Sequence, residues 1–223
     1  MNKKQVFACL AEQDPDTLLE FLEAAYQEMS TDQRRAVFGK ALEKSKPLAV
    51  EGESLLAEVK KFQRQSRAGK YYAPFDINSK NFMHVPEETN AWFERVGDLL
   101  TQSAQLSEQG DHVHAVACFR ILYALIDAME DGDEIVFADE YGAWMITVDE
   151  KKMIAAYFRS LAATATPEEY AAGALPLIRR DSFESFSKKT YAAAVRAADK
   201  AQKAHLQAEV ERQGIRTPPR RKK

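Results

Sequence analysis

The sequence predicts an all-α protein built from antiparallel helical hairpins, packed as a bundle or as a short solenoid-like array. Apolar residues recur every three or four positions along most of the chain, which is the period of an amphipathic helix. Several segments begin with residues that cap helices. The 223 residues include only nine glycines and eight prolines, so few positions interrupt the pattern.

A chain of this length buries enough apolar surface to fold without disulfides. Its two cysteines, Cys9 and Cys118, lie far apart and form no disulfide framework. The N-terminal stretch lacks the apolar run of a secretory signal peptide, and no window reaches the roughly 20 apolar residues of a membrane span. We therefore expect a cytoplasmic protein that does not enter a membrane.

We expect the first helical part over residues 1–68. Asp14 and Pro15 fit the N-cap and the first turn of a helix. One face of that helix is apolar and carries Leu18, Leu19, Leu22 and Tyr26. A reciprocal capping box fits residues 30–33, and another apolar stripe follows at residues 55–62.

Residues 69–86 interrupt the helical pattern. This segment is rich in aromatic residues, is punctuated by prolines and lacks any period. A loop of this length within a compact chain is usually functional or a linker. Its aromatic side chains need a surface to lie on, which argues against a free linker: Tyr71, Tyr72, Phe75 and Phe82.

The main helical body is expected over residues 87–213. Residues 113–129 are apolar almost all round, so this helix is predicted to lie at the centre of the core. Further capping boxes fit residues 147–150 and 166–169. From about residue 181 to 214 there is no proline and no internal glycine, and we expect the body to end in one long helix.

Residues 134–148 allow two interpretations. Tyr141 and Trp144 have helical spacing, which favours a short helix or an irregular turn. The β-prone residues on either side of a turn-like centre favour a small β-hairpin over residues 135–148 instead.

A cluster of acidic residues follows the central helix. It does not match a calcium-binding helix–loop–helix, because Met129 and Ala138 occupy two positions that need an oxygen ligand. An irregular divalent-cation site is an alternative, with the ligands Asp131, Asp133, Asp139 and Glu140. The other interpretation is that Gly132 stops the helix and that the acids keep the turn solvated.

His114 and Cys118 lie four residues apart, a spacing that places two side chains on one helix face. Together with Asp111 or His112 they would hold a zinc ion, or His114 would activate the Cys118 thiolate. A free cysteine in a strongly apolar run also behaves as a small hydrophobic residue. A metal-dependent or thiol enzyme is therefore one alternative for the function.

The same region resembles the turn and second helix of a tetratricopeptide hairpin. The resemblance spans residues 93–126 and lies in Gly110 and Asp111 at the turn, the small Ala115 and the aromatic Phe119. In that family glycine ends the first helix, alanine allows close packing and the aromatic residue fills the next groove. The resemblance implies a hairpin array of the kind that holds partner peptides, and it assigns no ligand-binding residue.

A basic tail follows the acidic body of the chain. We expect residues 214–223 to be disordered. Their charges would bind the phosphates of a nucleic acid through Arg216, Arg220, Arg221, Lys222 and Lys223. Such contacts give weak, salt-sensitive binding. No aromatic interleaving or recognition helix accompanies them, so the other interpretation is a solubilising tail.

The sequence favours a non-catalytic helical adaptor or scaffold that binds a protein partner and needs no cofactor. The partner surface is predicted to combine the aromatic loop with the turn that carries Asp139, Glu140, Tyr141 and Trp144. Aromatic side chains beside polar groups carry much of the energy of protein interfaces. Nucleic-acid association through the tail and metal-dependent or thiol catalysis are the alternatives.

Overall fold

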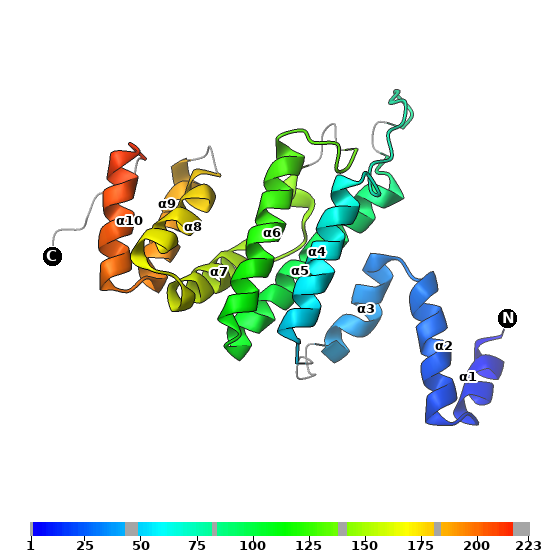
Figure 1. The fold of residues 1–223 in the computed structure, drawn as a ribbon. Coiled ribbons are helices and arrows are strands. Elements are labelled where there is room, and N and C mark those ends of the chain that lie inside the picture. The colour runs from blue at the N-terminus through cyan, green and yellow to red at the C-terminus, as the bar shows by residue number, and fades with distance from the viewer. Residues whose placement is uncertain (1, 43–48, 82–83, 138–141, 181–183, 216–223) are drawn as a thin grey trace. The chain divides into compact units, whose positions relative to one another are not determined.

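The computed structural model describes residues 2–42, 49–81, 84–137, 142–180 and 184–215. These residues form ten α-helices and one 3-10 helix, and they contain no strand (Figure 1). The all-α prediction is therefore confirmed. The chain divides into two compact units, Met1–Leu48 and Ala49–Lys223.

Three helices make up the described part of the first unit: α1 (Lys3–Ala11), α2 (Pro15–Glu28) and α3 (Thr31–Leu42). Asp14 caps α2 by accepting a hydrogen bond from the Thr17 N–H at 3.0 Å, and Pro15 follows it as predicted. Ser30 and Gln33 form the predicted reciprocal capping box, in which each backbone N–H bonds to the other side chain. The local start signals of α2 and α3 are thus confirmed.

Tyr26 joins α2 to α3. Its ring centroid lies 5.6 Å from that of Phe38, and the Arg34 guanidinium carbon lies 4.5 Å from the same centroid. Arg34 Nε also donates a hydrogen bond to the Tyr26 carbonyl oxygen at 2.9 Å. However, no residue of α1 or α2 is buried, and the structure describes every residue of both. These two helices therefore contribute no buried side chain to a core.

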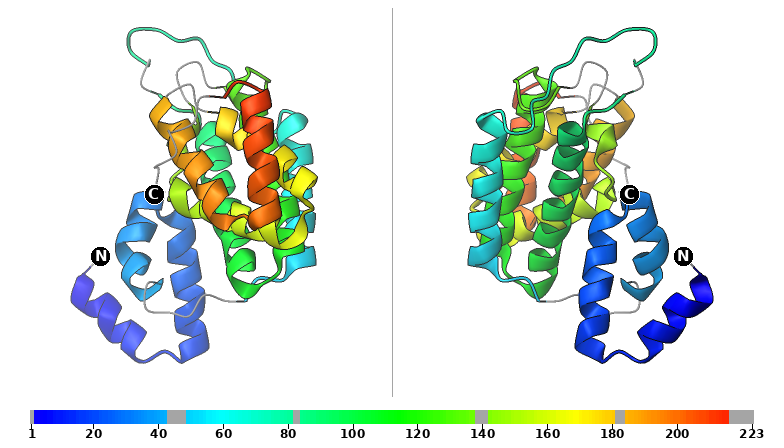
Figure 2. Two further views of the ribbon diagram at one scale, coloured as in Figure 1. Left: turned by 90° about the vertical axis from the view of Figure 1, so that its left-hand side faces the viewer. Right: turned by 90° about the vertical axis from the view of Figure 1, so that its right-hand side faces the viewer.

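The described part of the second unit contains α4 (Gly52–Arg67), α5 (Glu87–Gln109), α6 (His112–Glu130), the 3-10 helix η1 (Ala143–Met145), α7 (Glu150–Thr164), α8 (Pro167–Arg179), α9 (Glu184–Ala197) and α10 (Lys200–Arg212). α6 packs against α4, α5 and α7 (Figure 2). It buries Phe119, Leu122 and Leu125 completely. The prediction of a central core helix at residues 113–129 is confirmed.

Among the described residues, α6 is also the one helix that is long and apolar enough to cross a membrane, by length and composition alone. Half of its most apolar window is buried inside the protein. The central helix of a packed core meets the same criterion, because it is apolar on several sides.

α4 groups with the second unit, while its apolar stripe was assigned from the sequence to a helical part over residues 1–68. It buries Leu55, Val59 and Phe62 and packs against α6 and α5. An apolar stripe shows that a helix needs a neighbour, but it does not show which neighbour covers it. The boundary between the units therefore depends on contacts between residues far apart in the sequence.

α5 and α6 are joined by a tight turn at Gly110. This glycine has a φ of 88°, which residues with a Cβ rarely adopt, and it ends α5. Asp111 then caps α6 by accepting a hydrogen bond from the His114 N–H at 3.3 Å. Ala115 and Phe119 follow and are both buried in the core.

The expectation of one long helix over residues 181–214 is wrong. The structure contains α9 and α10 instead, and both pack against α8. Asp199 forms a capping box with Gln202 at the start of α10. The Gln202 side chain also donates hydrogen bonds to the carbonyl oxygens of Ala162 and Ala165, both at 3.0 Å. The capping box starts a new helix at Lys200, although the apolar spacing of α9 continues through this position without a break.

The small β-hairpin is not seen in the described part of residues 134–148, which leaves out 138–141. A single 3-10 turn, η1, lies there instead. The next helix is capped by Asp149, which accepts a hydrogen bond from the Lys152 N–H at 3.2 Å, and not by Thr147 as expected. The capping box predicted for α8 at residues 166–169 is confirmed.

Candidate binding sites

The aromatic loop and the segment that follows α6 meet at Phe137. The Phe75 ring centroid lies 5.1 Å and the Tyr72 centroid 6.3 Å from that of Phe137. Thr89 Oγ1 donates a hydrogen bond to the Phe137 carbonyl oxygen at 3.2 Å. The aromatic loop thus covers Phe137, which precedes the predicted turn, and part of its aromatic area is used in this contact.

The remaining residues of that expected surface differ in their exposure. Tyr71 packs on the core through Phe62, with 5.5 Å between the ring centroids, and burial raises the pKa of its hydroxyl. Trp144, in contrast, is 75 % exposed. The residues that lie outside the described part of the chain are Phe82, Asp139, Glu140 and Tyr141. Trp144 is therefore the described member of this surface that is most accessible to a partner.

A pocket of about 530 Å³ opens beside Trp144. Its walls come from α5, α6, α7, the end of α8 and the segment around η1, and its apolar lining consists of Leu100, Ile126, Ile146, Val148 and Met153. The Ala143 N–H donates a hydrogen bond to Glu130 Oε1 at 3.2 Å and so fastens η1 to the end of α6. A cavity of this size accepts a small molecule or a large side chain.

Arg180, which follows α8, is a largely buried cation in the lining of this pocket. Its side chain is only 14 % exposed, and its Nε donates to Asp127 Oδ1 at 3.0 Å. Glu130 Oε2 lies 4.0 Å from the same nitrogen. The guanidinium carbon lies 5.3 Å from the centre of the Tyr123 ring. The two carboxylates therefore compensate for the buried charge, which would otherwise be costly.

Two buried polar atoms of the pocket residues have no hydrogen-bond partner among the described residues: Arg180 Nη2 and the Tyr123 hydroxyl oxygen. A buried donor left unpaired costs about 1–3 kcal/mol. Burial raises the pKa of Tyr123, although Arg180 opposes the shift. The hydroxyl therefore keeps its proton at neutral pH and is able to donate a hydrogen bond. Burial also raises the pKa of Asp127, again against the effect of Arg180.

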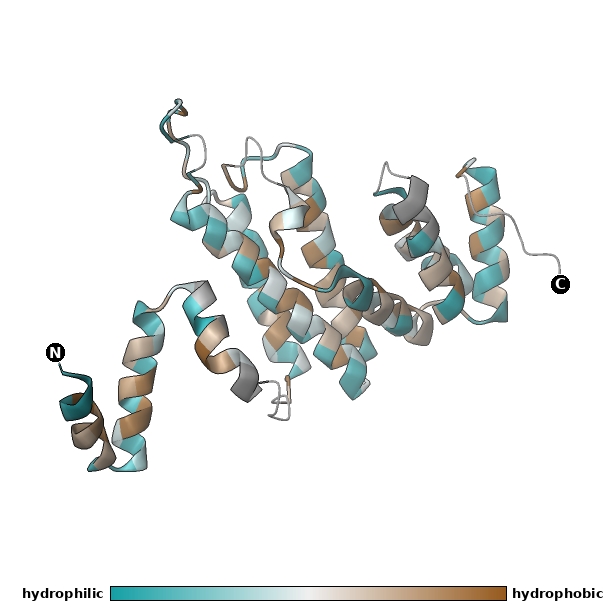
Figure 3. Ribbon diagram, turned by 180° about the vertical axis from the view of Figure 1, so that it is seen from behind, coloured by the Kyte–Doolittle hydropathy of each residue, from teal (hydrophilic) through white to brown (hydrophobic). Residues whose placement is uncertain are grey.

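The second candidate site is an apolar surface on the first unit. Its exposed large hydrophobic residues are Phe7, Leu19, Phe21, Leu22, Tyr26 and Val37. We call the four that lie on α2, from Leu19 to Tyr26, the α2 face, and Figure 3 shows apolar residues along much of this helix. Leu19 is 63 % exposed. A group of exposed apolar side chains of this kind marks interaction sites in other proteins.

The acidic cluster forms no metal site within the described part of the chain. Asp131 and Asp133 are exposed, while Asp139 and Glu140 lie outside the described residues. Among the side chains that are described, no three of His, Cys, Asp or Glu come together in a group that could hold a metal ion. α6 ends at Glu130 and is followed by this solvated turn.

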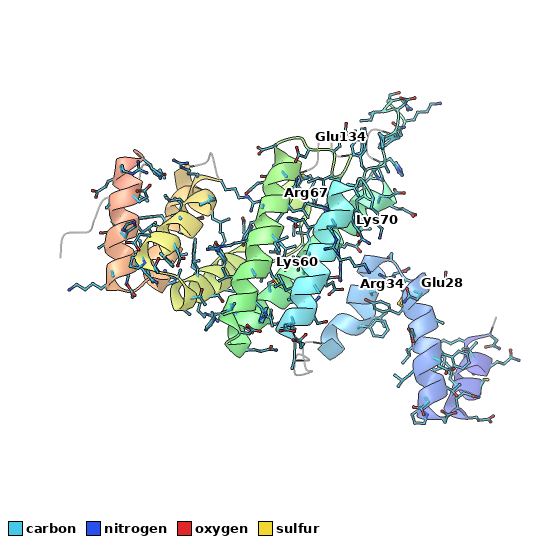
Figure 4. The ribbon with its side chains drawn as sticks, viewed as in Figure 1. Glu28, Arg34, Lys60, Arg67, Lys70 and Glu134 are labelled. Atoms are coloured by element: carbon cyan, nitrogen blue, oxygen red, sulfur yellow. The ribbon has the colours of Figure 1, made fainter. Side chains whose placement is uncertain are left out.

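The acids after α6 face the basic end of α4. Arg67 and Glu134, labelled in Figure 4, line a hollow of about 350 Å³. Arg67 Nη1 lies 3.9 Å from Asp133 Oδ2, and both side chains are more than half exposed. An exposed ion pair of this type contributes only about 0–1 kcal/mol to stability.

The histidines near Cys118 have other partners. His114 Nδ1 lies 2.8 Å from Asp111 Oδ2, and His112 Nδ1 lies 3.1 Å from Ser160 Oγ. Cys118 is buried in the core, which raises the pKa of its thiol to about 11. This environment corresponds to the interpretation of Cys118 as a small hydrophobic residue.

In the sequence analysis we assigned two residues of the pocket, Tyr123 and Arg180, to no site, and the predicted site in the basic tail lies outside the described residues. We counted Tyr123 with the apolar residues of the central helix and assigned no role to Arg180. The sequence places the pair Arg179–Arg180 directly after an apolar run, and residue types alone do not show that Arg179 is exposed while Arg180 is largely covered. The basic tail residues, from Arg216 to Lys223, lie outside the described residues, so the nucleic-acid hypothesis stays a prediction.

Comparisons of the chain with protein-family models, curated proteins and solved structures give no match. By its fold and its candidate sites, this is an all-α protein with a pocket in its second unit and an exposed apolar helix face in its first. Pockets and uncovered apolar faces are both typical of proteins that bind ligands or partners.

Proposed function

We propose that this protein is a non-catalytic helical adaptor that binds a protein partner through the α2 face. The observation that supports this most directly is that α2 buries none of its residues, while Leu19, Phe21 and Leu22 are exposed. Each large apolar side chain gains about 1.5–3 kcal/mol on full burial. A partner that covers this face would provide that burial.

The charges on α2 indicate what kind of partner fits. The helix contains the acidic residues Asp16, Glu20, Glu23 and Glu28 and no lysine or arginine. At 100° per residue, Asp16, Glu20 and Glu23 follow one edge of the α2 face. A helix of this type binds in an apolar groove with a basic rim. A second copy of the chain fits less well, because two α2 helices would oppose their carboxylates.

Two finer features belong to the same proposal. The α5–α6 turn, with Gly110, Ala115 and Phe119, supports an arrangement of helical hairpins in a bundle or a short tetratricopeptide-like array. Trp144, which is 75 % exposed, is the described residue of the sequence-predicted surface that a partner of the second unit would contact. We place this partner in the cytoplasm.

The test is capture of partner proteins from the source cells by the full-length chain and by variants of α2. Leu19→Ser with Leu22→Ser removes apolar area, and Glu20→Lys with Glu23→Lys reverses the charge of one edge. We expect each double variant to lower recovery of a defined partner at least about tenfold, since tenfold corresponds to only about 1.4 kcal/mol. Glu12→Lys, an exposed change outside α2, is the control.

Circular dichroism has to show unchanged helicity in each variant, and sedimentation of the chain alone reports self-association. Recovery that is sensitive to salt and to both double variants, but not to Glu12→Lys, supports the proposal. Equal recovery by all variants contradicts it. A dimer that dissociates with Leu19→Ser and Leu22→Ser would assign the face to a second copy and reject the partner.

A further inference from the structure

A row of exposed cations follows the outer side of α4. Lysine or arginine occupies five positions from 60 to 70, and residues 59–75 include no acid. Four of the five lie within the helix, and we call them the α4 basic face: Lys60, Lys61, Arg64 and Arg67. All four are exposed, and Figure 4 labels Lys60 and Arg67. The face is a local excess of positive charge in a chain whose net charge is −3.

The helical spacing of these residues directs them away from the core. At 100° per residue, Lys60, Arg64 and Arg67 fall within an arc of about 60°. Lys61 lies about 60° beyond that arc, and the buried residues of α4 occupy the opposite side of the helix. With a rise of 1.5 Å per residue, Lys60 and Arg64 are about 6 Å apart along the axis. Each cation can therefore face a different charge of an extended polyanion.

Acids of the same unit leave most of this positive charge uncompensated. Glu58, close before the face in the sequence, is bound by Arg95. Arg67 Nη1 lies 3.9 Å from Asp133 Oδ2, and both of these side chains are more than half exposed. Among the described residues, none forms an ion pair with the other three members of the face. The neighbouring helix α6 adds no acid over residues 112–126.

Helix stability does not account for the two lysines. The helix dipole favours cations in the last turn, where Arg64 and Arg67 lie. This effect falls off within that turn, so it does not extend to Lys60 and Lys61. Like charges four residues apart, as at Lys60 and Arg64, destabilise a helix slightly. A bound polyanion would relieve that repulsion.

The composition of the face distinguishes between negatively charged partners. Protein interfaces have an apolar and aromatic core and are depleted in lysine, whereas the large hydrophobic residues of α4 are buried or half-buried. A helix that lies on a membrane also needs an apolar face that enters the lipid. Contacts with a nucleic-acid backbone need only cations and other hydrogen-bond donors. Phosphates of a nucleic acid therefore fit this face best.

We propose that the α4 basic face binds the phosphate backbone of a nucleic acid without reading the bases. The lysine and arginine side chains donate hydrogen bonds to phosphate oxygens and displace counterions from the backbone. Binding of this kind is weak, falls steeply with salt and is equal for different base sequences. The site is independent of the function proposed for α2, and it uses none of the residues of the basic tail.

Fluorescence anisotropy of the full-length chain with labelled DNA of about 20 bases tests the proposal, with the strand alone and as a duplex, at about 25 to 200 mM salt. Lys60→Gln with Lys61→Gln removes two cations of the face. We expect at least about tenfold weaker binding at low salt, and a slope of log K against log salt that is shallower by about 2 for the duplex, because each phosphate contact contributes about 0.9. Arg64→Gln should reduce the slope by about 1.

Lys151→Gln with Lys152→Gln is the matched control. It removes two adjacent exposed lysines from α7 and changes the net charge by the same amount, and it should alter the affinity by less than about twofold. A second full-length variant replaces the last four basic residues of the tail, 220–223, by glutamine and so measures the contribution of the tail. Circular dichroism has to show unchanged helicity in every variant.

Three results would overturn the proposal. The first is the absence of binding to either form of DNA at the lowest salt concentration. The second is an equal loss in the α4 and α7 double variants, which would show an effect of net charge alone. The third is a loss in the tail variant only, which would assign the binding to the tail.

Two competitor probes test the other partner classes. A polyglutamate peptide and vesicles that contain phosphatidylserine are added to the complex with DNA. If either binds more tightly than DNA and depends on Lys60 and Lys61, the face belongs to an acidic protein or to a membrane, and the nucleic acid is rejected. Weaker binding of both, together with the expected slopes, supports the nucleic acid.

Discussion

At the scale of single residues, burial decides which groups can react. Cys118 lies in the core beside Ser103, and the loss of solvation raises its thiol pKa to about 11, although a hydrogen bond with Ser103 opposes the shift. Cys9 lies on α1 and is exposed. Two thiols of the same chain therefore have different accessibility, and the thiolate is the reactive form.

We predict that one thiol per native chain reacts with Ellman's reagent. At pH 8, a pKa of about 11 leaves only about one Cys118 side chain in a thousand as thiolate, and burial also keeps the reagent away. The measurement is the time course of thiol release before and after unfolding in guanidinium chloride. Cys9→Ser is the control and should show no fast reaction. Two fast thiols in the native chain would contradict the assignment of Cys118 to the core.

At the scale of elements, side chains that cap helices decide where helices begin. The apolar spacing of α9 runs on into α10 without a break. The helices are nevertheless separate, because Asp199 Oδ1 accepts a hydrogen bond from the Gln202 N–H at 2.8 Å and caps α10. The Asp199 N–H in turn donates to Gln202 Oε1 at 3.0 Å. Gln202 is buried and also reaches the end of α7 through Ala162. The break is therefore held by local and distant bonds together.

We predict that Asp199→Ala lowers the free energy of unfolding by about 1 kcal/mol, since loss of an N-cap side chain typically has this effect. Urea unfolding followed by circular dichroism measures it. Glu211→Ala, an exposed change within α10, is the control and should stay within about 0.5 kcal/mol. Alanine favours helix, so an Asp199→Ala variant with equal or higher stability would mean that one continuous helix is preferred.

At the scale of the whole molecule, the two units bury very different shares of their apolar residues. The second unit has a core that includes Trp92, Phe119, Phe158 and Leu161, all with no exposed area. α1 and α2 bury no residue. Since packing of an apolar face supplies most of the stability of a short helix, α2 should open far more readily than the central helix α6.

We predict that the backbone amides of α2 exchange with deuterium at least about a hundredfold faster than those of α6 in the full-length chain. Local opening needs little free energy where few apolar contacts are lost. Hydrogen exchange followed by mass spectrometry measures both helices in one sample, with α5 as an internal reference for the core. Equal protection of α2 and α6 would show that the α2 face is already covered.

Much of the secondary structure could be read from the sequence because its signals are local. The caps at Asp14, Ser30 and Thr166 act on residues within three positions, and the all-round apolar pattern of residues 113–129 marks the central helix. The cap of α10 is local as well, at Asp199, but the uninterrupted apolar spacing around it led us to expect one long helix. The partner surface stays a prediction, and the packing of its residues Tyr72 and Phe75 on Phe137 is a contact that residue spacing does not indicate.

The order and extent of most helices were thus determined by the sequence alone, through hydrogen bonds and side-chain spacing within a few residues. Only the tertiary structure decided which apolar faces are covered, as in α4, and which stay exposed, as in α2. It also placed Arg180 beside Tyr123 and Asp127, more than fifty positions away in the chain. Contacts of this kind depend on how helices pack, and the spacing of residues along one helix carries no information about its neighbour.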